Sequence, residues 1–267
     1  MRVTTESVLL LSPRINDTGL QLRAAAGRRG LRSHTATAWR APAELIGTPV
    51  HVYGGPLFAD AVGSALGLAL TQPPHDWLTV LPRELTGRRV ELTTLAEARA
   101  LRSPAFVKPP GDKLFPAKVY RDGSGLPGPD AMDDDSPVQV SEVVRFLREY
   151  RLFVLDGEVR AASRYALDGD LDEAPLAEDP YRAEVSAFAA DVLAASVGRL
   201  PSAVVVDVGL LEDGGWAAVE ANTAWASGGY ACDPDAVLDV VLRAGGPAER
   251  LAEADRRYCR ASASVVG

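Results

Sequence analysis

Asp207 and Glu220 are the two residues whose spacing most strongly indicates joint chemistry. They lie in apolar runs that flank an Asp-Gly-Gly turn, and such a turn predicts a β-hairpin over residues 204–222. If Leu211 opposes Trp216 at the turn, the register places Asp207 directly opposite Glu220 on one face of the sheet. Two facing carboxylates repel each other, so a purely structural hairpin would not favour this arrangement.

Asn222 extends this pair into a candidate metal site. It lies two residues beyond Glu220, so its side chain points to the same face of the predicted strand. Carboxylate and amide oxygens suit a hard cation such as Mg²⁺, which usually binds one or two carboxylates together with substrate phosphates. We therefore expect Asp207, Glu220 and Asn222 to hold a metal ion; the alternative is a solvated strand end.

A second predicted hairpin carries arginines. The turn at residues 155–158 pairs two strands so that Glu149 faces Arg164, with Arg151 on the same face. Guanidinium groups bind phosphate or carboxylate through two parallel hydrogen bonds, and a single carboxylate leaves this face positively charged. Taken alone, however, the hairpin is explained more simply by a cross-strand ion pair between Glu149 and Arg164.

Lys108 ends a predicted apolar strand, and Pro109 after it favours an extended backbone. A lysine at this position, just before the glycine-containing loop 109–112, suits contact with a phosphate. The sequence lacks the pattern of a Walker A loop. The alternative is a lysine that extends from the strand end into solvent.

The order of these elements resembles the ATP-grasp superfamily, which includes D-alanine–D-alanine ligase and glutathione synthetase. A lysine strand, an extended connector, an arginine hairpin and an Asp/Glu/Asn hairpin follow one another over residues 104–232. The phrases Phe-Val-Lys-Pro, at residues 106–109, and Glu-Tyr-Arg-Leu-Phe-Val-Leu-Asp-Gly, at 149–157, are most similar to the clade named for two arginines and one lysine. The Glu-Ala-Asn element at 220–222 is the most specific part of the resemblance.

For the nucleotide, the resemblance implies that Lys108 contacts ATP phosphates, with Lys113 or Lys118 as the second lysine. It implies that the segment 140–144 hydrogen-bonds adenine through its backbone. We count Glu149 among the nucleotide-binding residues. The linker residues expected at the nucleotide are Ser141, Glu142, Val143 and Val144.

For the chemistry, the resemblance implies that Arg151 and Arg164 face the γ-phosphate and the acyl phosphate or substrate carboxylate. With Lys108 they form the expected catalytic set. The Asp/Glu/Asn hairpin would hold Mg²⁺ between the ATP phosphates. Four aromatic residues near predicted loops either line the acceptor pocket or pack in the core: Tyr53, Trp77, Trp225 and Tyr230.

These roles imply an ATP- and Mg²⁺-dependent ligase that activates a small carboxylate as an acyl phosphate for attack by an amine. Two features depart from the family pattern. The glycine-rich phosphate loop is reduced to residues 109–112, and a different sequence, 222–230, replaces the usual tail after the asparagine. Two alternatives stay open: an ATP-binding module without ligase turnover, and a small-molecule phosphotransferase.

The fold class expected is mixed α/β and α+β, an ATP-grasp fold preceded by a small α/β domain. Short apolar strands alternate with helices in the first part of the chain, which predicts a parallel sheet. Paired strands follow. We expect an N-terminal domain over residues 1–95 and the nucleotide-binding and catalytic domain over 96–267.

Composition restricts the partners and the compartment. The net charge of −8 argues against nucleic acid, and no apolar run is long enough to span a bilayer. The N-terminus lacks a signal-peptide pattern and there are only two cysteines, so we expect a cytoplasmic protein without a disulfide framework. The expected partners are small molecules, not membranes, and a homodimer is the default assembly.

Overall fold

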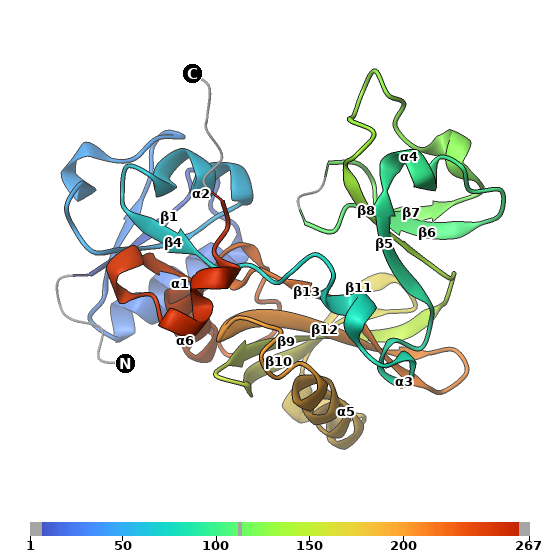
Figure 1. The fold of residues 1–267 in the computed structure, drawn as a ribbon. Coiled ribbons are helices and arrows are strands. Elements are labelled where there is room, and N and C mark those ends of the chain that lie inside the picture. Colours follow the sequence, from blue (N-terminus) through green and yellow to red (C-terminus); the bar gives the residue numbers. More distant parts are fainter. Residues whose placement is uncertain (1–6, 112–113, 262–267) are drawn as a thin grey trace.

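The chain folds into three lobes: an N-terminal lobe, a central sheet, and a smaller sheet on the side away from the first lobe (Figure 1). The computed structural model describes residues 7–111 and 114–261. Helix α5 (Arg182–Ala195) lies beneath the central sheet in this view. No helix in these two ranges is both long and apolar enough to cross a lipid bilayer.

The N-terminal lobe contains a parallel sheet in the order β2-β1-β3. Its strands are β1 (Val8–Leu11), β2 (Arg32–Thr35) and β3 (Val50–Tyr53), and its helices are α1 (Asp17–Arg28) and α2 (Pro56–Gly63). All four residues of β1 are buried, as expected for the central strand of a parallel sheet covered on both faces. The parallel sheet predicted from the alternation of strands and helices is confirmed.

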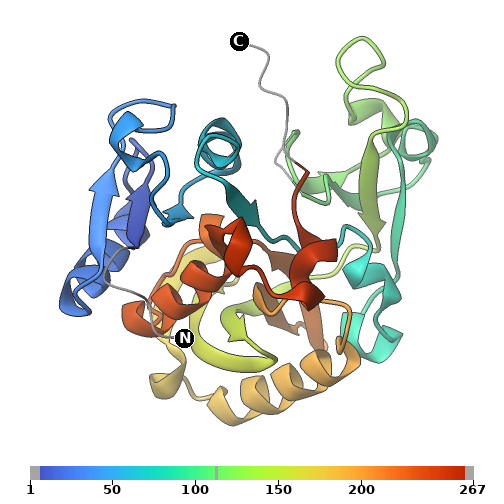
Figure 2. The same cartoon turned by 60° about the vertical axis from the view of Figure 1, so that its left-hand side comes forward.

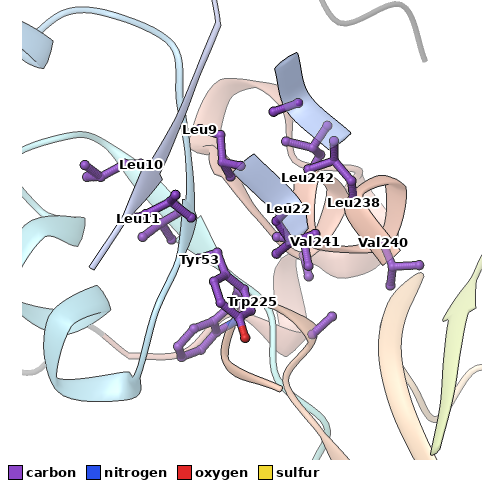
Figure 3. Close-up of a cluster of buried hydrophobic side chains, with 14 of the residues drawn as sticks. Leu9, Leu10, Leu11, Leu22, Tyr53, Trp225, Leu238, Val240, Val241 and Leu242 are labelled. Atoms are coloured by element: carbon purple, nitrogen blue, oxygen red, sulfur yellow. The ribbon is translucent and has the colours of Figure 1, made fainter. Parts of the chain in front are cut away.

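The C-terminal part of the chain returns to this lobe. Helix α6 (Pro234–Ala244) packs against α1, and β14 (Gly245–Pro247) pairs with β4 (Leu68–Leu70). Figure 2 shows α6, in orange-red, beside the blue N-terminal elements. Figure 3 shows the shared core, where leucines of β1 and α1 lie near leucines and valines of α6, with Tyr53 and Trp225 beside them. Segments from the N-terminal and the C-terminal parts of the described chain therefore share the core of the first lobe.

The central sheet is antiparallel, with the order β11-β10-β9-β12-β13. Its strands are β9 (Phe146–Leu155), β10 (Glu158–Leu167), β11 (Asp170–Pro175), β12 (Ala203–Leu211) and β13 (Trp216–Asn222). The β9–β10 turn contains Asp156 at φ 54° and Gly157 at φ 81°, left-handed conformations typical of an Asp-Gly hairpin turn. Every residue of β12 is buried, so this strand lies in the core.

The small sheet has the order β5-β8-β6-β7 and is also antiparallel. Its elements are β5 (Val90–Thr94), β6 (Ala105–Lys108), β7 (Lys118–Tyr120), β8 (Pro137–Ser141) and the short helix α4 (Leu95–Ala98). Thr94 and Glu97 form a capping box at the start of α4. Strand β5, which ends just before the expected domain boundary, pairs with β8.

Two chain segments cross between the small and central sheets and lie side by side. One follows helix α3 (Arg83–Thr86), and the other joins β8 to β9. Glu142 lies on the second of these segments. Its carboxylate accepts hydrogen bonds from the Arg89 backbone N–H at 2.8 Å and from Arg83 Nη2 at 2.9 Å, and both donors lie on or next to the first segment. The Glu142 N–H in turn donates to the Arg89 carbonyl at 3.1 Å. These hydrogen bonds therefore hold the two crossing segments together.

Candidate functional site

Asp207 and Glu220 face each other across β12 and β13, as the sequence predicts. The register at the turn differs by one residue from the predicted one, because Trp216 opposes Leu210 and not Leu211. A β-bulge directly after Asp207 shifts the pairing back. The shift at the turn and the bulge cancel each other, so Asp207 and Glu220 form the predicted pair.

Basic side chains neutralise both carboxylates. Arg151 of β9 lies across from Asp207, and its Nε and Nη2 donate to the two carboxylate oxygens at 2.9 and 2.6 Å. Lys108 forms an ion pair with Glu220. Asn222 Nδ2 donates to Glu220 at 2.8 Å and to Asp207 at 3.2 Å. The repulsion that led us to expect a metal ion is thus already balanced by Arg151 and Lys108.

Burial and charge act in opposite directions on these groups. Burial tends to raise the pKa of Glu220, but the Lys108 ammonium and the Asn222 amide outweigh it and lower the pKa to about 2. Burial disfavours the charged form of Arg151, yet the Asp207 carboxylate raises the pKa of the guanidinium. Glu220 and Arg151 are therefore charged at neutral pH.

The arginine hairpin, β9–β10, differs from the prediction. Two bulges in β10 shift the register, so Arg164 opposes Tyr150, and Glu149 opposes Ala166. The predicted facing pair of Glu149 and Arg164 is therefore wrong. A shift of one residue moves a side chain to the other face of a sheet, and this is what happens to Arg164.

Arg164 lies on the opposite sheet face from Arg151, where it binds Asp172 and Asp179. The Asp179 side chain has no exposed surface, and it also accepts from the Tyr150 hydroxyl at 2.9 Å. Arg164 therefore neutralises a buried carboxylate beside the central sheet. The structure does not bring it to the other predicted site residues.

Tyr165 takes the position on the site face that we expected for Arg164. Its hydroxyl donates to Glu149 at 2.6 Å, and its ring stacks on that of Tyr230 with centroids 5.2 Å apart. The Arg151 guanidinium lies 5.4 Å from the Tyr165 centroid. We did not predict this residue because the bulges that place it on the site face cannot be recognised in the residue pattern.

A cavity of 370 Å³ brings most of the predicted nucleotide-binding residues together, a size typical of small-molecule sites. It lies where the small sheet approaches β9, β10 and β13. Its lining includes the charged residues Lys108, Glu149 and Glu220 together with the predicted linker residues Ser141, Glu142, Val143 and Val144. Apolar walls come from Leu78, Val90, Phe106, Phe146 and Val219.

The linker residues 141–144 line this cavity. Within the ranges that the structure describes, the backbone of Val143 and Val144 makes no hydrogen bond to the chain. These groups are free to pair with the polar edge of a base. Glu142 differs, because its carboxylate and its N–H are both engaged by the other crossing.

Arg88 is a buried cation in the cavity wall that the sequence analysis did not single out. Its Nη1 donates to the Ala218 carbonyl at 2.9 Å and its Nη2 to that of Val219 at 3.2 Å. The guanidinium also lies 5.4 Å from the ring centroid of Phe146. Burial lowers its pKa to about 10, although nearby carboxylates favour the charged form. No motif marks this arginine, because its partners are backbone carbonyls: that of Thr86 nearby and two of a distant strand.

The three candidate lysines are in different positions. Lys108 lies in the cavity, with its side chain only 15% exposed. Lys118 is exposed, and its ammonium lies over the Tyr120 ring. Its neighbours Ala117 and Val119 line the cavity, so the alternation of β7 turns Lys118 to the other face. Lys113 is outside the described residues.

The donor set partly fits a magnesium ion. Glu220 and Asn222 carry oxygens of the kind that Mg²⁺ prefers, and Glu220 lines the cavity. Asp207 fits less well, because both of its oxygens accept hydrogen bonds from Arg151. Over the described residues, no cluster of three His, Cys, Asp or Glu side chains has the geometry of a metal site. A cation would therefore need phosphate oxygens as further ligands.

The four aromatic residues considered for the acceptor pocket lie in different surroundings. Trp77 and Trp225 are fully buried in two hydrophobic cores. Tyr53 is buried and donates to the Ser227 carbonyl at 3.1 Å. Tyr230 lies beside Arg151, with 5.0 Å between its ring centroid and the guanidinium. Only Tyr230 thus contacts a predicted site residue through its ring.

A second cavity, of 460 Å³, lies between α5 and the β9–β10 hairpin. Leu152, Val159, Val185 and Ala189 are among its mostly apolar lining residues, which include no lysine or arginine. It has no groups that would neutralise phosphates. The smaller cavity is therefore the better candidate for a nucleotide.

Comparisons with known proteins agree with this architecture. A family model described as ATP-grasp domain, R2K clade family 2, matches residues 85–240, more than half of the 267 residues. A solved RimK domain protein of ATP-grasp type from Sphaerobacter thermophilus has a TM-score of 0.51 at 15% identity, covering 88% of this chain and 99% of its own. A D-alanine–D-alanine ligase from Bacillus anthracis has a TM-score of 0.49 at 15% identity, with coverages of 89% and 96%.

No curated protein matches the sequence. The solved RimK domain protein shares the fold, and the family model spans the small sheet, the central sheet and the β12–β13 hairpin. The chain therefore has an ATP-grasp fold and belongs to the ATP-grasp domain family of the R2K clade, family 2.

Proposed function

We propose that this protein is an ATP-dependent ligase that joins a small carboxylate to an amine. The observation that carries the proposal is the cavity between the sheets. It combines a lysine, two carboxylates and a linker with unpaired backbone groups, which are the features needed to hold a nucleotide and its phosphates. Membership of the ATP-grasp family supports the same conclusion.

The reaction needs charge neutralisation more than a nucleophilic side chain. A carboxylate oxygen of the substrate would attack the γ-phosphorus of ATP, and the bond to the bridging oxygen would break to release ADP. The amine would then attack the acyl phosphate carbon, expel phosphate and lose a proton. Lys108 lines the cavity, and its ammonium would leave Glu220 to contact a phosphate oxygen.

A bound Mg²⁺ would add positive charge at the phosphates, held by Glu220 and Asn222. The loss of Lys108 from Glu220 would free that carboxylate for this purpose. Arg151 would keep Asp207 neutralised throughout, because the pair is buried and bidentate. We therefore propose a supporting role for Asp207 and a direct one for Glu220 and Asn222.

The test is ADP release from ATP and Mg²⁺ in the presence of pooled small acids and amines, with mass analysis of the products. We expect wild type to form an amide together with ADP and phosphate, and Lys108→Met to lose at least tenfold in kcat/KM. ATP protection against unfolding without any ADP would instead support a binding module. A phosphorylated product without an amide would support a phosphotransferase.

A further inference from the structure

We infer that Tyr165 is a positioning residue of the nucleotide site. It acts on two neighbouring residues, on one through its hydroxyl and on the other through its ring. Its hydroxyl orients the Glu149 carboxylate, and its ring holds the Arg151 guanidinium in place. The inference rests on the proposed function, because it assumes that the cavity binds a nucleotide. No sequence motif indicated this role for Tyr165.

The first contact concerns a carboxylate that forms no direct ion pair among the described residues. Asp207 has Arg151 and Glu220 has Lys108, but among the described residues Glu149 has no ion pair. Its hydrogen-bond partner is the Tyr165 hydroxyl, which donates to Oε2 at 2.6 Å. Since this bond engages one oxygen, Oε1 is left to accept from a ligand in the cavity that Glu149 and Tyr165 both line.

Without that bond, the Glu149 carboxylate would keep no hydrogen bond among the described residues. Asp207 and Glu220 are close enough to repel it, and Arg151 only partly offsets them. A buried polar group that loses its partner becomes both costly and poorly oriented. The hydroxyl of Tyr165 therefore determines where Glu149 presents its free oxygen.

The second contact concerns Arg151. Its Cζ lies 5.4 Å from the Tyr165 centroid and 5.0 Å from the Tyr230 centroid. The two rings are stacked at 12° to each other, so they form a continuous aromatic wall beside the guanidinium. Cation–π contacts of this kind strengthen when they are shielded from water. The wall therefore helps to keep Arg151 on Asp207 and away from the cavity.

Tyr165→Phe and Tyr165→Leu separate the two contacts. The phenylalanine keeps the ring and removes only the hydroxyl. We therefore expect the Kd for ADP and the KM for ATP to rise about tenfold, while kcat stays within twofold. The leucine removes the ring as well, so we expect kcat to fall at least tenfold in addition. Tyr258→Phe is the matched control, since its hydroxyl also donates to one acceptor, the Gly198 carbonyl at 2.9 Å, away from the cavity.

A double-mutant cycle with Glu149→Ala shows whether the hydroxyl acts through Glu149. We expect Tyr165→Phe to change ADP affinity, measured by calorimetry with Mg²⁺, less than twofold in the Glu149→Ala background. Wild-type ADP affinity in Tyr165→Phe, or fully additive effects in the cycle, would overturn the inference alone. A wild-type protein that binds no ADP would overturn the proposed function as well.

Discussion

Each of the three carboxylates at this site, one buried and two half-buried, is held by a different partner. Arg151 is bidentate on Asp207, and Lys108 pairs with Glu220. Among the residues that the structure describes, the hydrogen-bond partner of the Glu149 side chain is the hydroxyl of Tyr165. Burial, together with repulsion from Asp207 and Glu220, raises the pKa of Glu149 above its ordinary value. Keeping Glu149 ionised therefore costs stability, a cost that a binding function can explain.

Replacement of this carboxylate by a neutral amide is predicted to stabilise the fold at neutral pH. Because the pKa of Glu149 is higher in the folded chain, its ionisation disfavours folding above that pKa. The penalty disappears below the ordinary pKa of 4.5, where the group is neutral in both states. Glu149→Gln should raise the free energy of unfolding on the order of 1 kcal/mol at pH 7. Urea titrations at pH 7 and pH 3.5 test this, and an equal gain at both would contradict it.

Replacement of Arg164 is expected to destabilise the fold and to leave nucleotide binding unchanged, because its partners Asp172 and Asp179 lie away from the cavity. Arg164→Gln should lower the free energy of unfolding by about 3 kcal/mol, since the buried Asp179 would lose its nearest cation. Nucleotide affinity should stay within twofold of wild type. Arg160→Gln, an exposed arginine of the same strand, is the control and should change neither quantity. A selective loss of nucleotide binding in Arg164→Gln would return this residue to the catalytic set.

At the scale of the strands, the sequence predicts the elements better than their register. Asp-Gly turns and apolar runs identified both hairpins, and the facing of Asp207 and Glu220 is confirmed. The bulges in β10 and β13 were not predictable, because a bulge depends on how a strand meets its neighbours. They explain why Arg164 was wrongly placed beside Glu149 and why Tyr165 was missed. The pairing of Lys108 with Glu220 was missed for a related reason, since it joins two different sheets.

The crossing between the sheets depends on a glycine. Gly87 has φ 62°, and an added Cβ would lie 2.7 Å from Leu211 Cδ1 and 3.0 Å from the Ala217 Cβ. Gly87→Ala should therefore lower the free energy of unfolding by about 2 kcal/mol. Gly214→Ala is the control, because Gly214 has φ 87° but no atom within 4 Å of the added Cβ, and it should lose about 1 kcal/mol. Equal losses in chemical denaturation would show that the close approach at Gly87 is unimportant.

At the scale of the whole molecule, the three lobes meet around the β12–β13 hairpin, which carries Asp207 and Glu220. The loop after β13 is fixed to the first lobe, because the Gly229 N–H donates to Thr18 Oγ1 at 2.8 Å and Tyr53 donates to the Ser227 carbonyl. On the other side, Lys108 of the small sheet reaches Glu220. Residues from all three lobes are thus held at this hairpin. A ligand that replaces Glu220 as the partner of Lys108 would change the contact between two of them.

The most direct test of the account is calorimetric titration of a non-hydrolysable ATP analogue, with Mg²⁺, into three proteins. The account predicts saturable binding at one site in wild type and at least tenfold weaker binding in Lys108→Met, because a charge-assisted contact to phosphate is lost. Lys118→Met, whose lysine points away from the cavity, should bind within twofold of wild type. Absence of binding in wild type, or equal affinity in Lys108→Met, would contradict the account.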